Sequence, residues 1–131
     1  MKKDGVLNQD ISQLIASMGH MDTLTICDAG LPIPDYIWRI DLAVTPGIPS
    51  FMDVCKAVAS ELEVQQIFLA EELRDRNPKL AQLVKELFPN AELMYVTHNE
   101  FKRVSIESRA IIRTGECTPF ANVILVSGVT F

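Results

Sequence analysis

Apolar residues recur three or four positions apart in three segments of the chain, which is the spacing of one face of a helix. A polar residue that favours a helix start precedes each segment, and Asn-Pro opens the third. A shorter segment, HNEFKRVSIES, is predicted to be helical as well. The predicted helices are 8–18, 51–62, 78–87 and 98–108.

Runs of β-branched and apolar residues lie between these segments and predict strands. The segment 36–44 alternates polar and apolar positions and lies between Pro34 and Pro46. This favours a strand at the edge of a sheet, because proline cannot donate a hydrogen bond to a neighbouring strand. The other predicted strands are 23–28, 64–70, 93–97, 110–114 and 122–131.

The alternation of strands and helices predicts an α/β fold with a mostly parallel sheet flanked by helices. A chain of 131 residues is long enough for one hydrophobic core and too short for two, so we expect a single domain over 1–131. Only the short segment GECTPFA separates the last two strands. Since a parallel crossover needs about a dozen residues or more, we expect an antiparallel strand pair at the C-terminal end.

Composition and charge exclude several classes of protein. Hydrophobic residues make up 48% and charged residues 22% of the chain, as in ordinary globular domains. The net charge of -5, without any large Lys/Arg cluster, argues against nucleic acid or an anionic membrane as a partner. No apolar run approaches membrane-spanning length, and the 3 cysteines are too widely spaced for a disulfide framework or a zinc site. We therefore expect a soluble, cytoplasmic protein with reduced cysteines.

Polar and aromatic residues follow three of the predicted strands at their carboxyl ends, which is where ligands bind in open α/β sheets. Asp28 follows the first strand, and His98 and Lys102 follow the strand 93–97. The segment RTGECTPFAN (113–122), at the end of the strand 110–114, adds Arg113, Glu116, Phe120 and Asn122. Each also has a simpler interpretation as a turn residue, a helix cap or, for Phe120, an ordinary core residue.

His20 lies at the opposite end of the first strand. About five residues at roughly 3.3 Å each place it ~16 Å from Asp28. If both side chains belong to one pocket, a second copy of the chain supplies one of them, and the pocket is a subunit interface. The alternative is a structural role for His20 at the end of the first helix.

Sequence motifs for nucleotide binding and for nucleophilic catalysis are absent. The segment GLPIPD is not a phosphate-binding loop, and neither nucleotide-binding glycine pattern nor a nucleophile elbow occurs. Two histidines without a third clustered ligand argue against a catalytic metal. Proton transfer and ligand binding are the functions that remain.

Seven short segments occur in order along the whole chain. They are GVLN (5–8), GH.D (19–22), DAGLPIP (28–34), PG.PSF (46–51), AEE (70–72), THNEFK (97–102) and IRTGECTPFANVILVSGVTF (112–131). Each segment alone is a weak signal, but their order and spacing together are specific. In these segments the chain resembles the ribose pyranase and fucose mutarotase family.

The resemblance implies an enzyme that interconverts the pyranose and furanose forms of D-ribose without a cofactor and supplies the furanose to ribokinase. It also implies a homodecamer of two pentamers, with the sugar sites between subunits. By position, His20 resembles the proton-donating catalytic histidine of the family. The family's sugar-binding positions match Asp28, His98, Phe120, Ala121 and Asn122. Lys102 lies one helical turn beyond His98, where it can join them.

Proton transfer is all that this reaction requires. Ring opening protonates the ring oxygen and deprotonates the anomeric hydroxyl, and ring closure then uses a different hydroxyl. A histidine side chain suits both steps, since the unperturbed pKa of an imidazole is ~6.5.

Phe120 departs from the family pattern, which usually has tyrosine at this position. A phenyl ring can pack against a sugar face but cannot donate a hydroxyl hydrogen bond, which is typically worth ~1 kcal/mol. We therefore expect weaker binding rather than none. Two alternatives stay open: an L-fucose-type mutarotase that exchanges α and β anomers, and a non-catalytic sugar-binding accessory protein that needs no proton-transfer residue.

Overall fold

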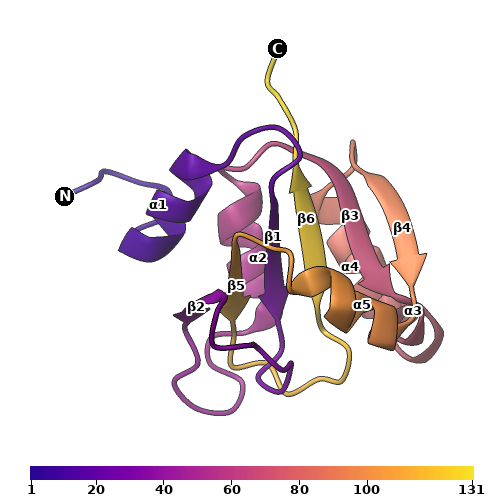
Figure 1. Cartoon of the computed structure of the whole chain (residues 1–131). Helices are drawn as coiled ribbons and strands as arrows, with labels where there is room; N and C mark the ends of the chain where they lie inside the picture. Colours follow the sequence, from indigo (N-terminus) through magenta and orange to yellow (C-terminus); the bar gives the residue numbers. More distant parts are fainter.

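The computed structural model describes residues 1–131 and shows a six-stranded sheet with helices on both faces (Figure 1). The strands are β1 (Thr23–Cys27), β2 (Trp38–Asp41), β3 (Val64–Ala70), β4 (Glu92–Val96), β5 (Ala110–Arg113) and β6 (Val123–Ser127). The helices are α1 (Gln9–Ser17), α2 (Phe51–Ala59), α3 (Glu71–Arg76), α4 (Pro78–Leu87) and α5 (His98–Ser105).

The strand order in the sheet is β2-β5-β1-β6-β3-β4. β2, β5 and β1 are mutually parallel, as are β3 and β4, whereas β6 lies antiparallel between β1 and β3. This confirms the expected α/β class, with a mostly parallel sheet and an antiparallel strand at the C-terminal end. The antiparallel partners of β6 are β1 and β3 and not β5, because both hydrogen-bonding edges of β5 are occupied by β1 and β2.

Side-chain caps begin three helices where the sequence predicts them. The side chains of Asn8, Ser50 and Asn77 accept hydrogen bonds from the backbone N–H groups of Ile11, Asp53 and Leu80. The segment before Asn77 forms a further helix, α3, which the apolar spacing does not predict. This helix follows β3 without a loop and ends at Arg76, and the next residue, Asn77, caps both the end of α3 and the start of α4.

The sheet buries a hydrophobic cluster on each face. The larger cluster joins the sheet to α1, α2 and α4, and the smaller one joins it to α5 through Phe101. Ile111 belongs to the smaller cluster and Ile112 to the larger, as expected for neighbours on one strand. In Figure 1, α2 and α4 lie behind the sheet and α5 lies in front of it.

The segments that carry the predicted site residues lie together at one edge of the sheet. The five strands other than β6 all run in the same direction, so their carboxyl ends lie at this edge. β6 runs in the opposite direction, so its beginning, and residues 120–122 before it, lie at this edge too.

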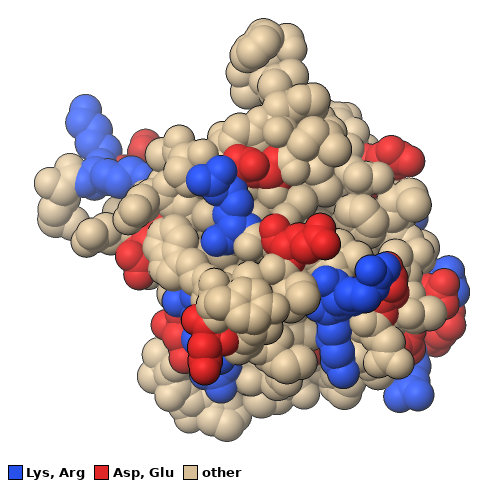
Figure 2. All heavy atoms as spheres, viewed as in Figure 1, with Lys and Arg blue, Asp and Glu red and all other residues tan.

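The molecular surface carries no single-sign patch on the face seen in Figure 2, where acidic and basic side chains are interspersed. None of the five helices has the length and hydrophobicity needed to cross a bilayer.

Candidate active site

A cavity of about 240 Å³ lies at the edge of the sheet where β1 ends. Its lining consists of Asp28, Gly30, Leu31, Pro32, His98, Lys102, Pro119 and Phe120. The structure thus brings together four residues that the sequence places in a sugar site: Asp28, His98, Lys102 and Phe120. They come from the loop after β1, from α5 and from the turn before β6.

Asp28 is held in place by the fully buried side chain of Asn122. Nδ2 of Asn122 donates to Oδ2 of Asp28 over 3.1 Å, and the backbone N–H of Asp28 donates to Oδ1 of Asn122 over 2.8 Å. Oδ1 of Asp28 accepts from the backbone N–H of Gly30 over 2.9 Å, which forms an Asx turn. Asn122 does not line the cavity, so it holds the Asp28 carboxylate from the side that faces the protein interior.

Phe120 and Ala121 form the tight turn that leads into β6. Phe120 has a φ of 64°, and its carbonyl accepts from the backbone N–H of Asn122 over 2.8 Å. Such a φ is uncommon for a residue other than glycine. The ring of Phe120 lies at the cavity, edge to face with the His98 ring at a centroid distance of 4.9 Å. Ala121 is buried in the larger hydrophobic cluster and does not line the cavity.

His98 is the first residue of α5. Its backbone N–H donates to both carboxylate oxygens of Glu72, over 2.8 and 3.2 Å, while Nδ1 of its ring is buried without a hydrogen-bond partner. Burial lowers the pKa of His98 below its usual value, the charge of Lys102 lowers it further, and Glu72 and Asp28 act in the opposite direction. The imidazole is therefore mainly neutral at pH 7 and able to hydrogen-bond a neutral ligand.

Lys102 lies one helical turn after His98, is half-buried and forms no ion pair. The cavity therefore offers a carboxylate, an ammonium group, an imidazole and an aromatic ring. This set can hydrogen-bond several hydroxyl groups and pack against an apolar ring face, as a small polyhydroxylated ligand requires. No group of three or more His, Cys, Asp or Glu residues in the structure is arranged to bind a metal ion.

His20 lies at the opposite end of β1 from this cavity. Its side chain is exposed, and Nε2 is 2.9 Å from Oε1 of Gln65. It lines a separate cavity of about 510 Å³, together with residues of α1, the segment 61–63 and the segment 127–131. Within one chain, the structure does not bring His20 to Asp28 or His98.

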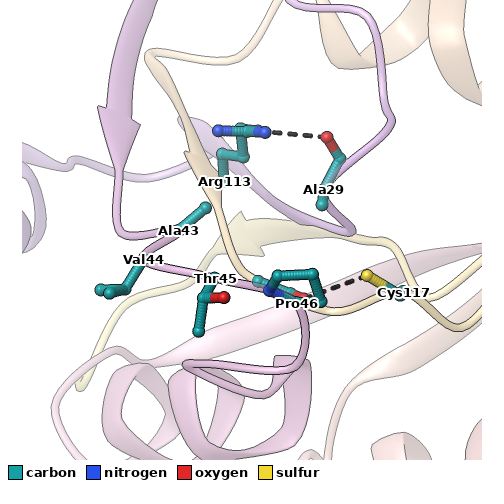
Figure 3. A pocket seen from close by; sticks show the side chains of 8 residues that line it. Ala29, Ala43, Val44, Thr45, Pro46, Arg113 and Cys117 are labelled. Carbon is teal, nitrogen blue, oxygen red and sulfur yellow. Dashed lines mark hydrogen bonds between the residues drawn. The ribbon is translucent and has the colours of Figure 1, made fainter.

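Arg113 and Glu116 support the neighbouring loops and do not line the cavity that Asp28 shares with His98, although Glu116 and Asp28 both line a second cavity of about 370 Å³. Arg113 donates from Nη1 to the carboxylate of Asp41 over 3.0 Å and from Nε to the carbonyl of Ala29 over 3.1 Å. Figure 3 shows this second bond beside another cavity of about 240 Å³. The backbone carbonyl of Glu116 accepts from Ala29 over 2.8 Å, and its carboxylate accepts from the N–H of Phe51 over 3.1 Å.

Glu72 hydrogen-bonds His98 of the site, but no sequence motif assigns it this role. It belongs to the segment AEE, and its partner is a backbone N–H group, which has no side-chain signature in a sequence. Its place just beyond the carboxyl end of β3, at the same edge of the sheet as Asp28, is the signal that points to it.

Comparison with known proteins identifies the family. Residues 1–130 match the RbsD / FucU transport protein family. The chain belongs to this family. Two of its relatives are the D-ribose pyranases of Lactobacillus gasseri and Escherichia coli O6:H1, which are 53% and 50% identical to it over the full length of both chains.

Solved structures of RbsD / FucU proteins show the same fold. The structure of Bacillus subtilis RbsD complexed with D-ribose matches with a TM-score of 0.95 and 43% identity, and 100% of each chain is covered. The fucose mutarotase from Streptococcus pneumoniae in complex with L-fucose has a TM-score of 0.77 and 21% identity over 95% of each chain, a likeness of fold alone.

Proposed function

We propose that this protein is an isomerase that interconverts the pyranose and furanose forms of D-ribose and so supplies ribofuranose to a ribokinase. The observation that carries the proposal is the cavity that Asp28 and His98 share, in a chain about 50% identical over its full length to D-ribose pyranases. The Bacillus subtilis neighbour, whose structure contains D-ribose, has the same fold over its whole length.

The cavity residues bind and orient the sugar. Asp28 accepts hydrogen bonds from sugar hydroxyls, and its orientation is set by the buried amide of Asn122. The imidazole of His98 and the ammonium group of Lys102 supply the complementary hydrogen bonds, and the ring of Phe120 packs against the apolar face of the sugar.

His20 of a neighbouring subunit acts as the proton donor to the ring oxygen. Two features support this role: the imidazole is exposed, and it lies at the opposite end of β1 from Asp28, so only another copy of the chain can bring the two together. The assembly is a homodecamer with one site in each cleft between subunits, and the enzyme works in the cytoplasm. His98 is the only other histidine and hence the alternative imidazole donor.

Magnetisation-exchange NMR tests the reaction directly. With the protein present, we expect faster exchange between the ribopyranose and ribofuranose signals of D-ribose, and a smaller effect on the anomers of L-fucose. A larger acceleration with L-fucose would indicate a mutarotase of the fucose type. Ribose binding without any acceleration would indicate a non-catalytic sugar-binding protein.

Mixed oligomers test the composite site. His20→Ala and Asp28→Asn are each expected to abolish most activity alone, because each damages every site. When the two variants are coexpressed and assemble randomly, about one quarter of the sites combine an intact His20 with an intact Asp28, so about a quarter of the activity is expected to return. Ribose exchange in the purified mixed oligomer measures this. If no activity returns, both residues act within one chain, whereas a His20→Ala variant that is active by itself would show that His20 has no catalytic role.

A further inference from the structure

We propose that Glu72 is a positioning residue of the sugar pocket, which acts by holding His98. The role of the pocket as a ribose site rests on the proposed function, whereas the contact itself is seen in the structure. Glu72 does not line the cavity, so it reaches a ligand only through His98.

The contact joins two helices that meet at the edge of the sheet. Glu72 lies in the first turn of α3, and both of its carboxylate oxygens accept from the backbone N–H of His98, the first residue of α5, over 2.8 and 3.2 Å. The first N–H groups of a helix have no partner within the helix, and a carboxylate is a favourable acceptor for them. Glu72 therefore fixes the backbone from which the His98 ring projects.

The His98 ring has no hydrogen bond of its own within the chain. Nδ1 is buried without a partner. The ring is placed by packing against Phe120, edge to face at 4.9 Å, and against Phe101, stacked at 6.5 Å between centroids. Since no side-chain hydrogen bond orients the ring, its position depends on this packing and on the backbone that Glu72 holds.

Glu72 also offsets positive charge at the ring. The charged groups that act on His98 are Lys102 on its own helix, Glu72 on α3 and Asp28 in the loop after β1. The guanidinium group of Arg76, also on α3, lies over the Phe120 ring at 5.3 Å from its centroid. Lys102 lowers the pKa of His98, whereas Glu72 and Asp28 raise it. Loss of the Glu72 charge is therefore expected to lower the pKa of His98 further.

Loss of Glu72 is expected to weaken ribose binding and to leave the catalytic rate nearly unchanged. If His98 contacts the sugar equally in the ground state and in the transition state, its displacement raises KM and leaves kcat nearly unchanged. Glu72→Ala removes the acceptor and the charge, while Glu72→Gln removes the charge and keeps an oxygen that accepts from the His98 N–H. Ser50→Ala is the matched control, since it removes a helix-capping hydrogen bond on α2, away from His98.

Ribose titrations followed by NMR, together with exchange kinetics, measure the effect. Glu72→Ala is expected to raise the ribose Kd and KM about tenfold with kcat within about twofold, whereas Ser50→Ala leaves all three within about twofold. In a His98→Ala background, Glu72→Ala is expected to cause no further rise in Kd. Glu72→Gln is expected to lower the pKa of His98, read from its imidazole proton resonances.

Three results would overturn the proposal: an unchanged ribose Kd in Glu72→Ala, an equal rise in the His98→Ala background, or an unmoved His98 titration in Glu72→Gln. Failure of the proposed function gives a different result, which is the absence of accelerated ribose exchange in the unsubstituted protein. The His98 titration needs no substrate and reports on Glu72 in either case.

Discussion

His20→Ala is expected to reduce the rate of ribose ring exchange by about 10²–10⁴-fold, the range that positioned acid–base catalysis supplies. Ribose affinity is expected to stay within about tenfold, because the variant leaves unchanged the residues that line the proposed sugar cavity. Magnetisation-exchange NMR gives the rate, and a ribose titration gives the affinity. His20 is exposed, so its replacement is expected to change the free energy of unfolding by no more than about 0.5 kcal/mol.

Gln65→Ala is the matched control for this variant. It removes the group that lies 2.9 Å from Nε2 of His20 but keeps the imidazole, so it is expected to retain activity within about tenfold of the unsubstituted protein. An equal loss in the two variants would show that the local hydrogen bond matters more than the imidazole. Undiminished turnover in His20→Ala would transfer the proton-donor role to His98.

Asn122→Ala is expected to have the largest effect on both stability and binding. The variant leaves the Asp28 N–H without its acceptor and removes the donor to the Asp28 carboxylate. Loss of partners in a buried hydrogen-bonded pair typically costs about 1–3 kcal/mol. Because the carboxylate then loses its fixed orientation, the ribose Kd is expected to rise at least about tenfold. Urea unfolding and ribose titration measure the two effects.

Ser108→Ala separates these effects. Ser108 and Thr25 form a buried hydroxyl pair at 2.8 Å, and neither residue lines the sugar cavity. The variant is expected to lose a similar free energy of unfolding and to bind ribose normally. If Asn122→Ala binds ribose as tightly as Ser108→Ala does, Asn122 supports the fold and not the site.

Local sequence features predict most of the secondary structure of this chain. Asn8, Ser50 and Asn77 cap helices at the expected places because a side-chain cap bonds a backbone group only a few residues away. The helix α3 has no apolar spacing that predicts it, because its only apolar residue is the buried Leu73 among five charged residues. It is positioned by the neighbouring elements and not by an apolar face of its own.

The candidate site, like the secondary structure, is predictable only in part from the sequence. Asp28, His98 and Lys102 are predictable because each follows a strand at its carboxyl end, where α/β sheets bind ligands. The sequence predicts that Asn122 binds the sugar directly. In the structure, its buried side chain hydrogen-bonds the Asp28 carboxylate. Glu72 was not assigned a role, since a bond to a backbone N–H group 26 residues away leaves no pattern in the sequence.

The sequence by itself determined the six strands, four of the five helices, the α/β class and the family, because periodicity, capping and motif spacing can be read along the chain without its tertiary contacts. Only the tertiary structure decided that β6 inserts between β1 and β3, which brings Phe120 and Asn122 to the same edge of the sheet as Asp28. It also decided that Glu72 holds His98. These outcomes depend on pairings between residues that are far apart along the chain, and the free energy of such pairings is set by the whole fold.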